Sequence, residues 1–231
     1  TSMSGSFIDR LTEAIREKQS RVVVGLDPRP DLFPEPLRTR AEAAGPRAMH
    51  FLLHEFCASV IDAVAPHAVA VKPQIAFFER YGYWGLVAYA ETVACARRRG
   101  LLVIGDVKRG DIGSTAVAYA RAHLVPERRD EDGCDVDAIT VNPLFGTDGV
   151  QPFLDVAREH GKGLFVLVKT SNPSSAEIQD LVSEGRPVYE HIAALVHRWG
   201  ESISEGDGWT PVGAVVGATW PEVARRLRML M

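Results

Sequence analysis

The side chains best suited to do chemistry lie in one stretch of the chain, residues 101–115. Four apolar residues, enough for one buried strand, run directly into two acids and a base, Asp106, Lys108 and Asp111. Because successive side chains of a strand point to opposite faces, Asp106 and Lys108 are expected on the same side of the strand end. Two glycines follow and loosen the backbone, so Asp111 could curl back or reach a neighbouring chain. A loop whose charges merely pair with one another is the alternative, and the rest of the chain decides between the two.

Polar or charged residues also follow five other apolar runs. The runs are 22–26, 68–71, 136–141, 164–168 and 213–217, and the residues that follow them include Asp27, Lys72, Asn142, Ser171 and Thr219. A (β/α) barrel would bring all these strand ends into one ring, whereas in an open sheet only those at the switch point could meet. Charges at the ends of three consecutive parallel strands are partly desolvated and need partners, which favours a functional site.

The segments between these runs are expected to be helices. Apolar residues at three- and four-residue spacing predict helices over 6–18, 46–65, 85–99, 114–123, 148–160, 175–183, 187–199 and 221–230, with a charged loop over 127–132. The apolar runs are continuous, which is typical of parallel strands covered by helices on both faces. We therefore expect one α/β domain over residues 1–231, a (β/α)8 TIM-type barrel of which about six strand–helix units are present. Because a complete barrel has eight strands, about 40 or more residues of the natural protein, with the last two strands, are expected outside this sequence.

Composition places the chain among ordinary globular proteins. Of its 231 residues, 46% are hydrophobic and 24% charged, and the net charge of -4 favours neither nucleic acid nor a membrane as a partner. No apolar run approaches the roughly 18 residues of a membrane span. The three cysteines are widely spaced, so neither disulfides nor a metal site is predicted, and a reducing cytoplasm is the expected location. The Gly-x4-Gly of a phosphate loop occurs at 105–110, but Asp111 stands where the lysine belongs.

The motifs at the strand ends resemble one known family. The segment Asp106-Val-Lys108-Arg-Gly-Asp111-Ile-Gly-Ser-Thr115 resembles the signature of orotidine 5′-phosphate decarboxylases, and in particular of their longer bacterial, type 2, subfamily. Other motifs match that subfamily's strand ends in the same order: Gly25-Leu-Asp27-Pro, Val71-Lys72-Pro-Gln74, Val141-Asn142-Pro143, Thr170-Ser171-Asn172-Pro173 and Val216-Gly217-Ala218-Thr219. The resemblance extends over nearly the whole chain.

The resemblance implies a homodimeric barrel that converts orotidine 5′-monophosphate to uridine 5′-monophosphate and CO2. This is the last step of de novo pyrimidine synthesis, and the family performs it without a metal or an organic cofactor. The charged tetrad implied for this chain consists of Lys72, Asp106, Lys108 and Asp111. Asp111 and Thr115 would reach the site of the partner subunit.

The resemblance also implies which residues hold the substrate. Asp27 would bind ribose hydroxyls, Ser171 would bind the pyrimidine, and Asn142 would be a further substrate-binding residue. The family's glycine-rich phosphate loop and its arginine at strand eight have no counterpart before Met231. The phosphate-binding residues are therefore expected beyond that position.

Decarboxylation sets a demand that these residue types can meet. Loss of CO2 from C6 of the pyrimidine leaves an sp2 carbanion with no adjacent π system, so the barrier must fall through electrostatics. An ammonium beside C6 stabilises charge that develops only in the transition state, and Lys108 could then protonate C6. Asp106 and Asp111 would keep Lys108 charged and oriented, while Lys72 offsets their repulsion. Strain of the substrate carboxylate against Asp106 ranks second.

Two other hypotheses remain open at this point. A sugar-phosphate decarboxylase or aldolase of the same superfamily shares the Asp-x-Lys-x-x-Asp core but uses Mg2+, and such relatives favour glycine where this chain has Ile112. A catalytically silent nucleotide-binding barrel would bind a uridine monophosphate analogue and release no CO2. Metal dependence tests the first alternative, and CO2 release tests the second.

Overall fold

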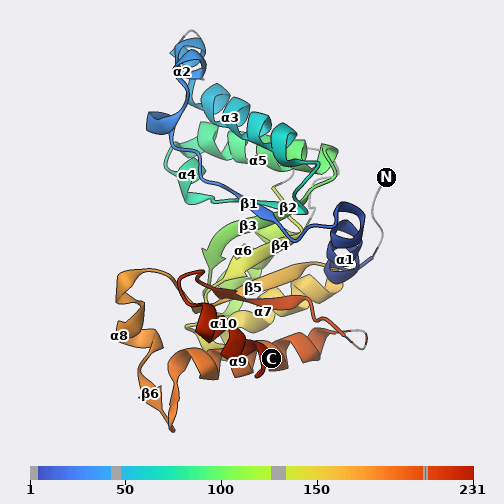
Figure 1. Ribbon diagram of the computed structural model, residues 1–231, viewed down its shortest axis with the longest axis vertical. Coiled ribbons are helices and arrows are strands. Elements are labelled where there is room, and N and C mark those ends of the chain that lie inside the picture. The colour runs from blue at the N-terminus through green and yellow to red at the C-terminus, as the bar shows by residue number, and fades with distance from the viewer. Residues whose placement is uncertain (1–4, 43–47, 126–133, 205, 207) are drawn as a thin grey trace. The chain divides into compact units, whose positions relative to one another are not determined.

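The computed structural model describes residues 5–42, 48–125, 134–204, 206 and 208–231 (Figure 1). The chain divides into two compact units, which are described one at a time. The first comprises residues 9–107 and 122–137, and the second comprises residues 5–8, 108–121 and 138–231. The charged loop predicted over 127–132 lies outside the described residues. In the described part of the chain, no helix is long and apolar enough to span a membrane.

The first unit is built on three parallel strands. Its elements are most of α1 (Phe7–Lys18), β1 (Val23–Leu26), η1 (Pro30–Leu32), α2 (Glu35–Glu42), α3 (Ala48–Val64), β2 (Ala70–Pro73), α4 (Ala76–Glu79), α5 (Gly82–Arg98) and most of β3 (Leu102–Arg109). β2 pairs in parallel with β1 and with β3, so that Ala70 lies beside Val23 on one side and Leu102 on the other. The helices α3 and α5 lie side by side (Figure 1). Buried side chains of these helices and of the strands form the core, among them Leu53, Ile61, Tyr89, Val93, Val69, Val71 and Val103.

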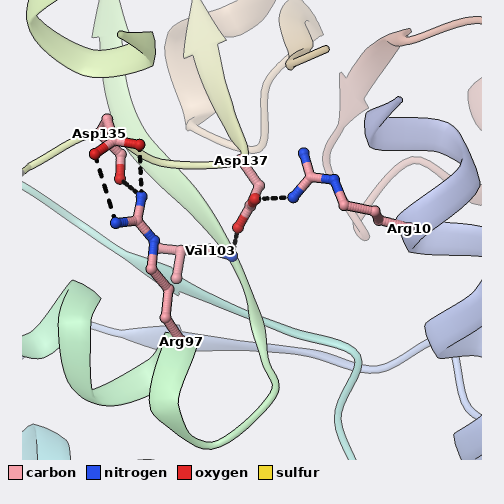
Figure 2. Close-up of polar contacts among 5 residues, drawn as sticks. All are labelled: Arg10, Arg97, Val103, Asp135 and Asp137. Atoms are coloured by element: carbon pink, nitrogen blue, oxygen red, sulfur yellow. Dashed lines mark hydrogen bonds and ion pairs between the residues drawn. The ribbon is translucent and has the colours of Figure 1, made fainter. Parts of the chain in front are cut away.

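Two aspartates just before β4 tie the first unit together (Figure 2). The Asp137 carboxylate accepts the Val103 N–H at 2.8 Å and forms an ion pair with Arg10. The Arg97 guanidinium faces Asp135 and donates to its Oδ2 at 2.8 Å and to its backbone carbonyl. Both aspartates are 7% exposed. These carboxylates stay buried because each has a cation, and Asp137 also a backbone amide, to replace water.

The second unit also contains three parallel strands with helices. Its elements are most of α6 (Gly113–Leu124), β4 (Ala138–Val141), α7 (Gly146–Glu159), β5 (Gly163–Lys169), η3 (Pro173–Ser175), α8 (Ala176–Gln179), β6 (Val182–Ser183), β7 (Arg186–Pro187), α9 (Val188–Ile203), β8 (Val212–Val216) and α10 (Pro221–Arg228). β5 pairs in parallel with β4 and β8. The helices α7 and α9 pack on β5. The core includes Ile139, Val141, Phe153, Leu154, Leu164, Val166, Ala193 and Val196.

The structure confirms the six predicted strands and most of the predicted helices, but the helix predicted over 175–183 is wrong. Only the short turns η3 and α8 form there, and the antiparallel hairpin β6–β7 follows. Glu184 and Gly185 make the two-residue turn with φ of 50° and 75°. A Gly in such a turn is a hairpin signal, because both central residues need positive φ. The prediction also missed α2, which is mostly polar, and α4, which has only four residues and is too short to show a helical period.

The expectation that every strand is covered on both faces is wrong for β1 and β8. The interior strands β2 to β5 are almost wholly buried, as continuous apolar runs predict. In contrast, Val23 of β1 is 40% exposed, and β8 is only half-buried after Val212. Among the described strands, β1 pairs only with β2 and β8 only with β5, so each has an open edge.

Cys57 of α3 provides a pH-dependent test of the first unit's core. Burial raises the pKa of its thiol from 9.0 to about 12. Because the folded-state pKa lies above the unfolded one, the stabilisation is complete below pH 9 and is lost as the pH rises toward 12. We expect the free energy of unfolding to fall between pH 8 and pH 10 by about 1 kcal/mol more in the parent protein than in Cys57→Ala, measured by urea titration. Equal losses in the two proteins would contradict this assignment.

Candidate active site

Two charges of the predicted tetrad meet in the first unit. Gln74 lies opposite Asp106 in a parallel bridge, so the pairing of β2 with β3 puts Lys72 and Asp106 on the same face as diagonal neighbours. The Lys72 Nζ donates to Asp106 Oδ2 at 2.7 Å. Asp106 is only 6% exposed, whereas Lys72 is half-buried. A buried carboxylate is costly unless it is paired, and the Lys72 ammonium meets that need.

Asp27 lies at the same edge of the first unit's strands. Its strand β1 is in register with β2, with Gly25 beside Lys72. Asp27 directly follows Leu26, the last residue of β1, and a residue before proline favours the extended region. The Asp27 carboxylate turns back toward Gly25, where a Cβ would lie 3.7 Å from Asp27 Oδ1. The carboxylate is exposed, as binding of ligand hydroxyl groups would require.

Lys108, near the end of β3, departs from regular strand geometry. Its φ is 45°, in the left-handed region, which costs a residue with a Cβ about 1–2 kcal/mol. Two hydrogen bonds hold this backbone: the Lys108 N–H donates to Thr140 Oγ1 at 2.9 Å, and the Arg109 carbonyl accepts the Asn142 N–H at 2.9 Å. The regular alternation of side chains assumed in the sequence analysis therefore ends at Val107. A strained backbone held in this way is typical of functional positions.

Asp111, Thr115 and Asn142 lie in or beside two loops of the second unit that are in close contact. A Cβ on Gly110 would lie 2.9 Å from the Asn142 carbonyl oxygen, so only glycine fits between these loops. The Asp111 carboxylate accepts the N–H of the next residue at 2.8 Å, and Asn142 Oδ1 accepts the N–H two residues on at 3.0 Å. Thr115 is exposed in the first turn of α6. Local hydrogen bonds thus shape both loops.

Ser171 lies in the loop that follows β5 and is exposed. The end of β8 presses against it, since a Cβ on Gly217 would lie 2.9 Å from the Ser171 Cβ. The motifs Thr170-Ser171 and Gly217-Ala218, which lie at or just after the ends of two successive predicted strands, are therefore adjacent in space. Thr219 lies in the turn after β8, before α10.

The sequence analysis did not select Thr140, although its hydroxyl holds the Lys108 amide. The sequence feature that could have indicated Thr140 is its hydroxyl, the one polar group among the apolar residues of β4. Thr140 is 3% exposed. The spacing that makes glycine necessary at residues 110 and 217 is likewise a tertiary property. Among the described residues, no group of three or more His, Cys, Asp or Glu side chains is arranged to hold a metal ion.

Parallel strands alternating with helices, with charged residues at or near the carboxyl ends of the strands, are the features of (β/α)-barrel enzymes. The family model described as "Orotidine 5'-phosphate decarboxylase / HUMPS family" matches residues 20–229. The chain belongs to this family, which confirms the resemblance found in its motifs.

Relatives of the chain carry the same name. The chain is 44% identical over 226 residues to the orotidine 5′-phosphate decarboxylase of Rhodopirellula baltica, covering 98% of this chain and 75% of the relative. It is 40% identical over 232 residues to that of Caldicellulosiruptor bescii, covering 98% of this chain and 76% of the relative. Its structure is similar to the solved OMP decarboxylase of Leishmania donovani, with a TM-score of 0.76 and 33% identity over 97% of this chain and 75% of that one. The predicted α/β barrel class is confirmed.

Proposed function

We propose that this chain carries the catalytic centre of an orotidine 5′-phosphate decarboxylase, a carboxy-lyase that converts orotidine 5′-monophosphate to uridine 5′-monophosphate and CO2. Family membership and the names of relatives at 40–44% identity support the reaction. The single observation that carries the site is the ion pair of Lys72 with the buried Asp106, two residues before Lys108 on the same strand. We also propose a cytoplasmic location, because few, widely spaced cysteines are typical of a reducing compartment.

In the proposed reaction, the bond between C6 and the carboxylate breaks and its electron pair stays on C6. The Lys108 ammonium stabilises this charge as it develops and then transfers a proton from Nζ to C6. Asp106 and Asp111 keep this ammonium charged and oriented, and Lys72 offsets the repulsion between the two carboxylates. The strained backbone at Lys108 supports this role, because strain is retained where a side chain must be held in one place.

The active form is proposed to be a homodimer in which Asp111 completes the tetrad of the partner subunit and Thr115 contacts its substrate. Both residues lie beside exposed apolar side chains of the second unit. Ile112, Val117 and Tyr119 are 57%, 42% and 36% exposed. The free energy is lowered when a second copy of the chain covers exposed apolar groups of this kind.

The remaining contacts to the substrate come from loops at the strand ends. Asp27 binds the ribose hydroxyls through its exposed carboxylate, and Ser171 binds the pyrimidine through its hydroxyl. Asn142 contributes from the loop after β4, where its backbone also supports the strained segment of β3. No nucleic acid or membrane takes part in this function.

Purified protein with its natural termini is expected to release CO2 from orotidine 5′-monophosphate, with the loss of substrate followed by ultraviolet absorbance. Dialysis against EDTA should leave the rate unchanged, because the proposed steps use only Lys and Asp side chains. Turnover that requires added Mg2+, or activity on a sugar phosphate alone, would favour the metal-dependent alternative. Binding of uridine 5′-monophosphate without CO2 release would favour a silent nucleotide-binding barrel.

A further inference from the structure

Lys169, the last residue of β5, has a charged side chain inside the second unit. It is 1% exposed. Its Nζ donates to Asp180 Oδ1 at 2.6 Å and to Ser175 Oγ at 3.3 Å. The ammonium also lies 4.6 Å from the centre of the Trp220 ring, a favourable cation–π distance. One lysine thus joins the end of β5, the α8 region and the segment before α10.

Stability alone is a poor reason to bury this lysine. The desolvation of an ion pair often cancels its Coulomb energy, and apolar residues of similar size usually stabilise a fold as well or better. Asp180 is partly exposed, with 41% of its side chain accessible, so only the ammonium is fully removed from water. The arrangement is better explained by what the pair holds in place.

The pair closes a loop of eleven residues, 170–180, by joining the residue before it to its last residue. Thr170, at the start of the loop, takes part in three further hydrogen bonds to Gln179 and Trp220. Its N–H donates to Gln179 Oε1 at 2.9 Å, its Oγ1 accepts from Gln179 Nε2 at 2.8 Å, and its carbonyl accepts the Trp220 indole N–H at 2.9 Å. The start and end of the loop are therefore fastened both to each other and to the body of the unit.

Ser171 is the residue next to this fastening. Its own side chain is exposed, while the residue before it is fixed by Gln179 and Trp220. Gly217 is in close contact with Ser171. The Gly217 N–H also donates to the Lys169 carbonyl at 2.7 Å. The backbone at Ser171 is thus held by contacts of Lys169, Thr170 and Gly217.

We propose that the Lys169–Asp180 ion pair is a positioning device that holds the 170–180 loop and so fixes the Ser171 hydroxyl for the pyrimidine of the substrate. The inference rests on the proposed function, in which Ser171 binds that ring. Lys169 touches no substrate and acts only through Ser171. A group misplaced by about 1 Å can lose on the order of 100-fold in rate, so the loop must be held closely.

Kinetics test whether Lys169 acts through Ser171. We expect Lys169→Met to lower kcat/KM for orotidine 5′-monophosphate by about 10- to 100-fold. In a Ser171→Ala background, Lys169→Met should lower kcat/KM by less than about two-fold, because the hydroxyl that Lys169 positions is absent. Lys162→Met, at the opposite end of β5, is the matched control and should keep the parent rate. A double variant whose loss in kcat/KM equals the product of the two single losses would overturn the positioning role.

Hydrogen exchange provides a readout that does not depend on activity. In Lys169→Met and in Asp180→Asn, amides over 170–180 should exchange at least about ten-fold faster, while those over α7 keep the parent rates. Asp180 is partly exposed, so its variant should fold even if Lys169→Met does not. Unchanged exchange over 170–180 in Asp180→Asn would overturn the proposal. Absence of turnover in the parent protein would instead overturn the proposed function, and exchange would still decide whether the pair holds the loop.

Discussion

Lys108→Ala is expected to lower kcat/KM for orotidine 5′-monophosphate by at least about three orders of magnitude, or ~4 kcal/mol of activation free energy. The ammonium has two tasks in the proposed reaction, since it stabilises the C6 carbanion and then protonates it. Loss of one preorganised donor alone costs about 100- to 1,000-fold in other enzymes. The decrease should appear in the ultraviolet assay with the protein in its natural length.

Two controls separate this loss from a loss of fold. The Lys108 side chain is exposed, so the urea midpoint of Lys108→Ala should stay at or above that of the parent. Lys162→Ala removes a lysine from the other end of the second unit's strands and should leave the rate unchanged. Turnover by Lys108→Ala within ten-fold of the parent would show that another group supplies the charge and the proton.

Asp137→Ala is expected to lower the free energy of unfolding of the first unit by about 3–5 kcal/mol. The change takes the carboxylate from both the Arg10 guanidinium and the Val103 N–H (Figure 2). Removal of one member of a buried ion pair leaves the other without its compensating charge, which costs more than the pair contributes. Urea titration at neutral pH measures the loss.

A matched control uses an exposed ion pair of the same unit. Asp62 accepts from Arg99 Nε at 2.5 Å, and about half of each side chain is exposed. Solvent can replace such a contact, so the urea midpoint of Asp62→Ala should stay close to that of the parent. Asp137→Asn keeps one side-chain oxygen, so its urea midpoint should fall between those of Asp137→Ala and Asp62→Ala. Equal midpoints for Asp62→Ala and Asp137→Ala would refute the importance of the buried network.

The parallel α/β class and the family could be predicted because their signals are local. A continuous apolar run that ends at a charge or an Asx-Pro step marks a strand and its carboxyl end without any tertiary information. The run before Asp106 shows this well, since β3 is buried from Leu102 to Val107. The helices α3 and α5 were predicted within about three residues at each end, because their apolar faces are long and regular.

Features that depend on distant contacts could not be predicted. The left-handed backbone of Lys108 depends on the Thr140 hydroxyl, 32 residues away. The burial of Lys169 depends on Asp180 and Trp220, and nothing in its own segment distinguishes it from a surface lysine. The hairpin β6–β7 was missed because its two strands have two residues each, too few to show a period. The roles of the tetrad remain predictions for the experiments above.

The unusual backbone at Lys108 has a thermodynamic consequence for the family's chemistry. At that torsion a glycine avoids the steric cost of about 1–2 kcal/mol that a residue with a Cβ incurs. The strain of this backbone and the proposed roles of the ammonium therefore favour different residues at one position.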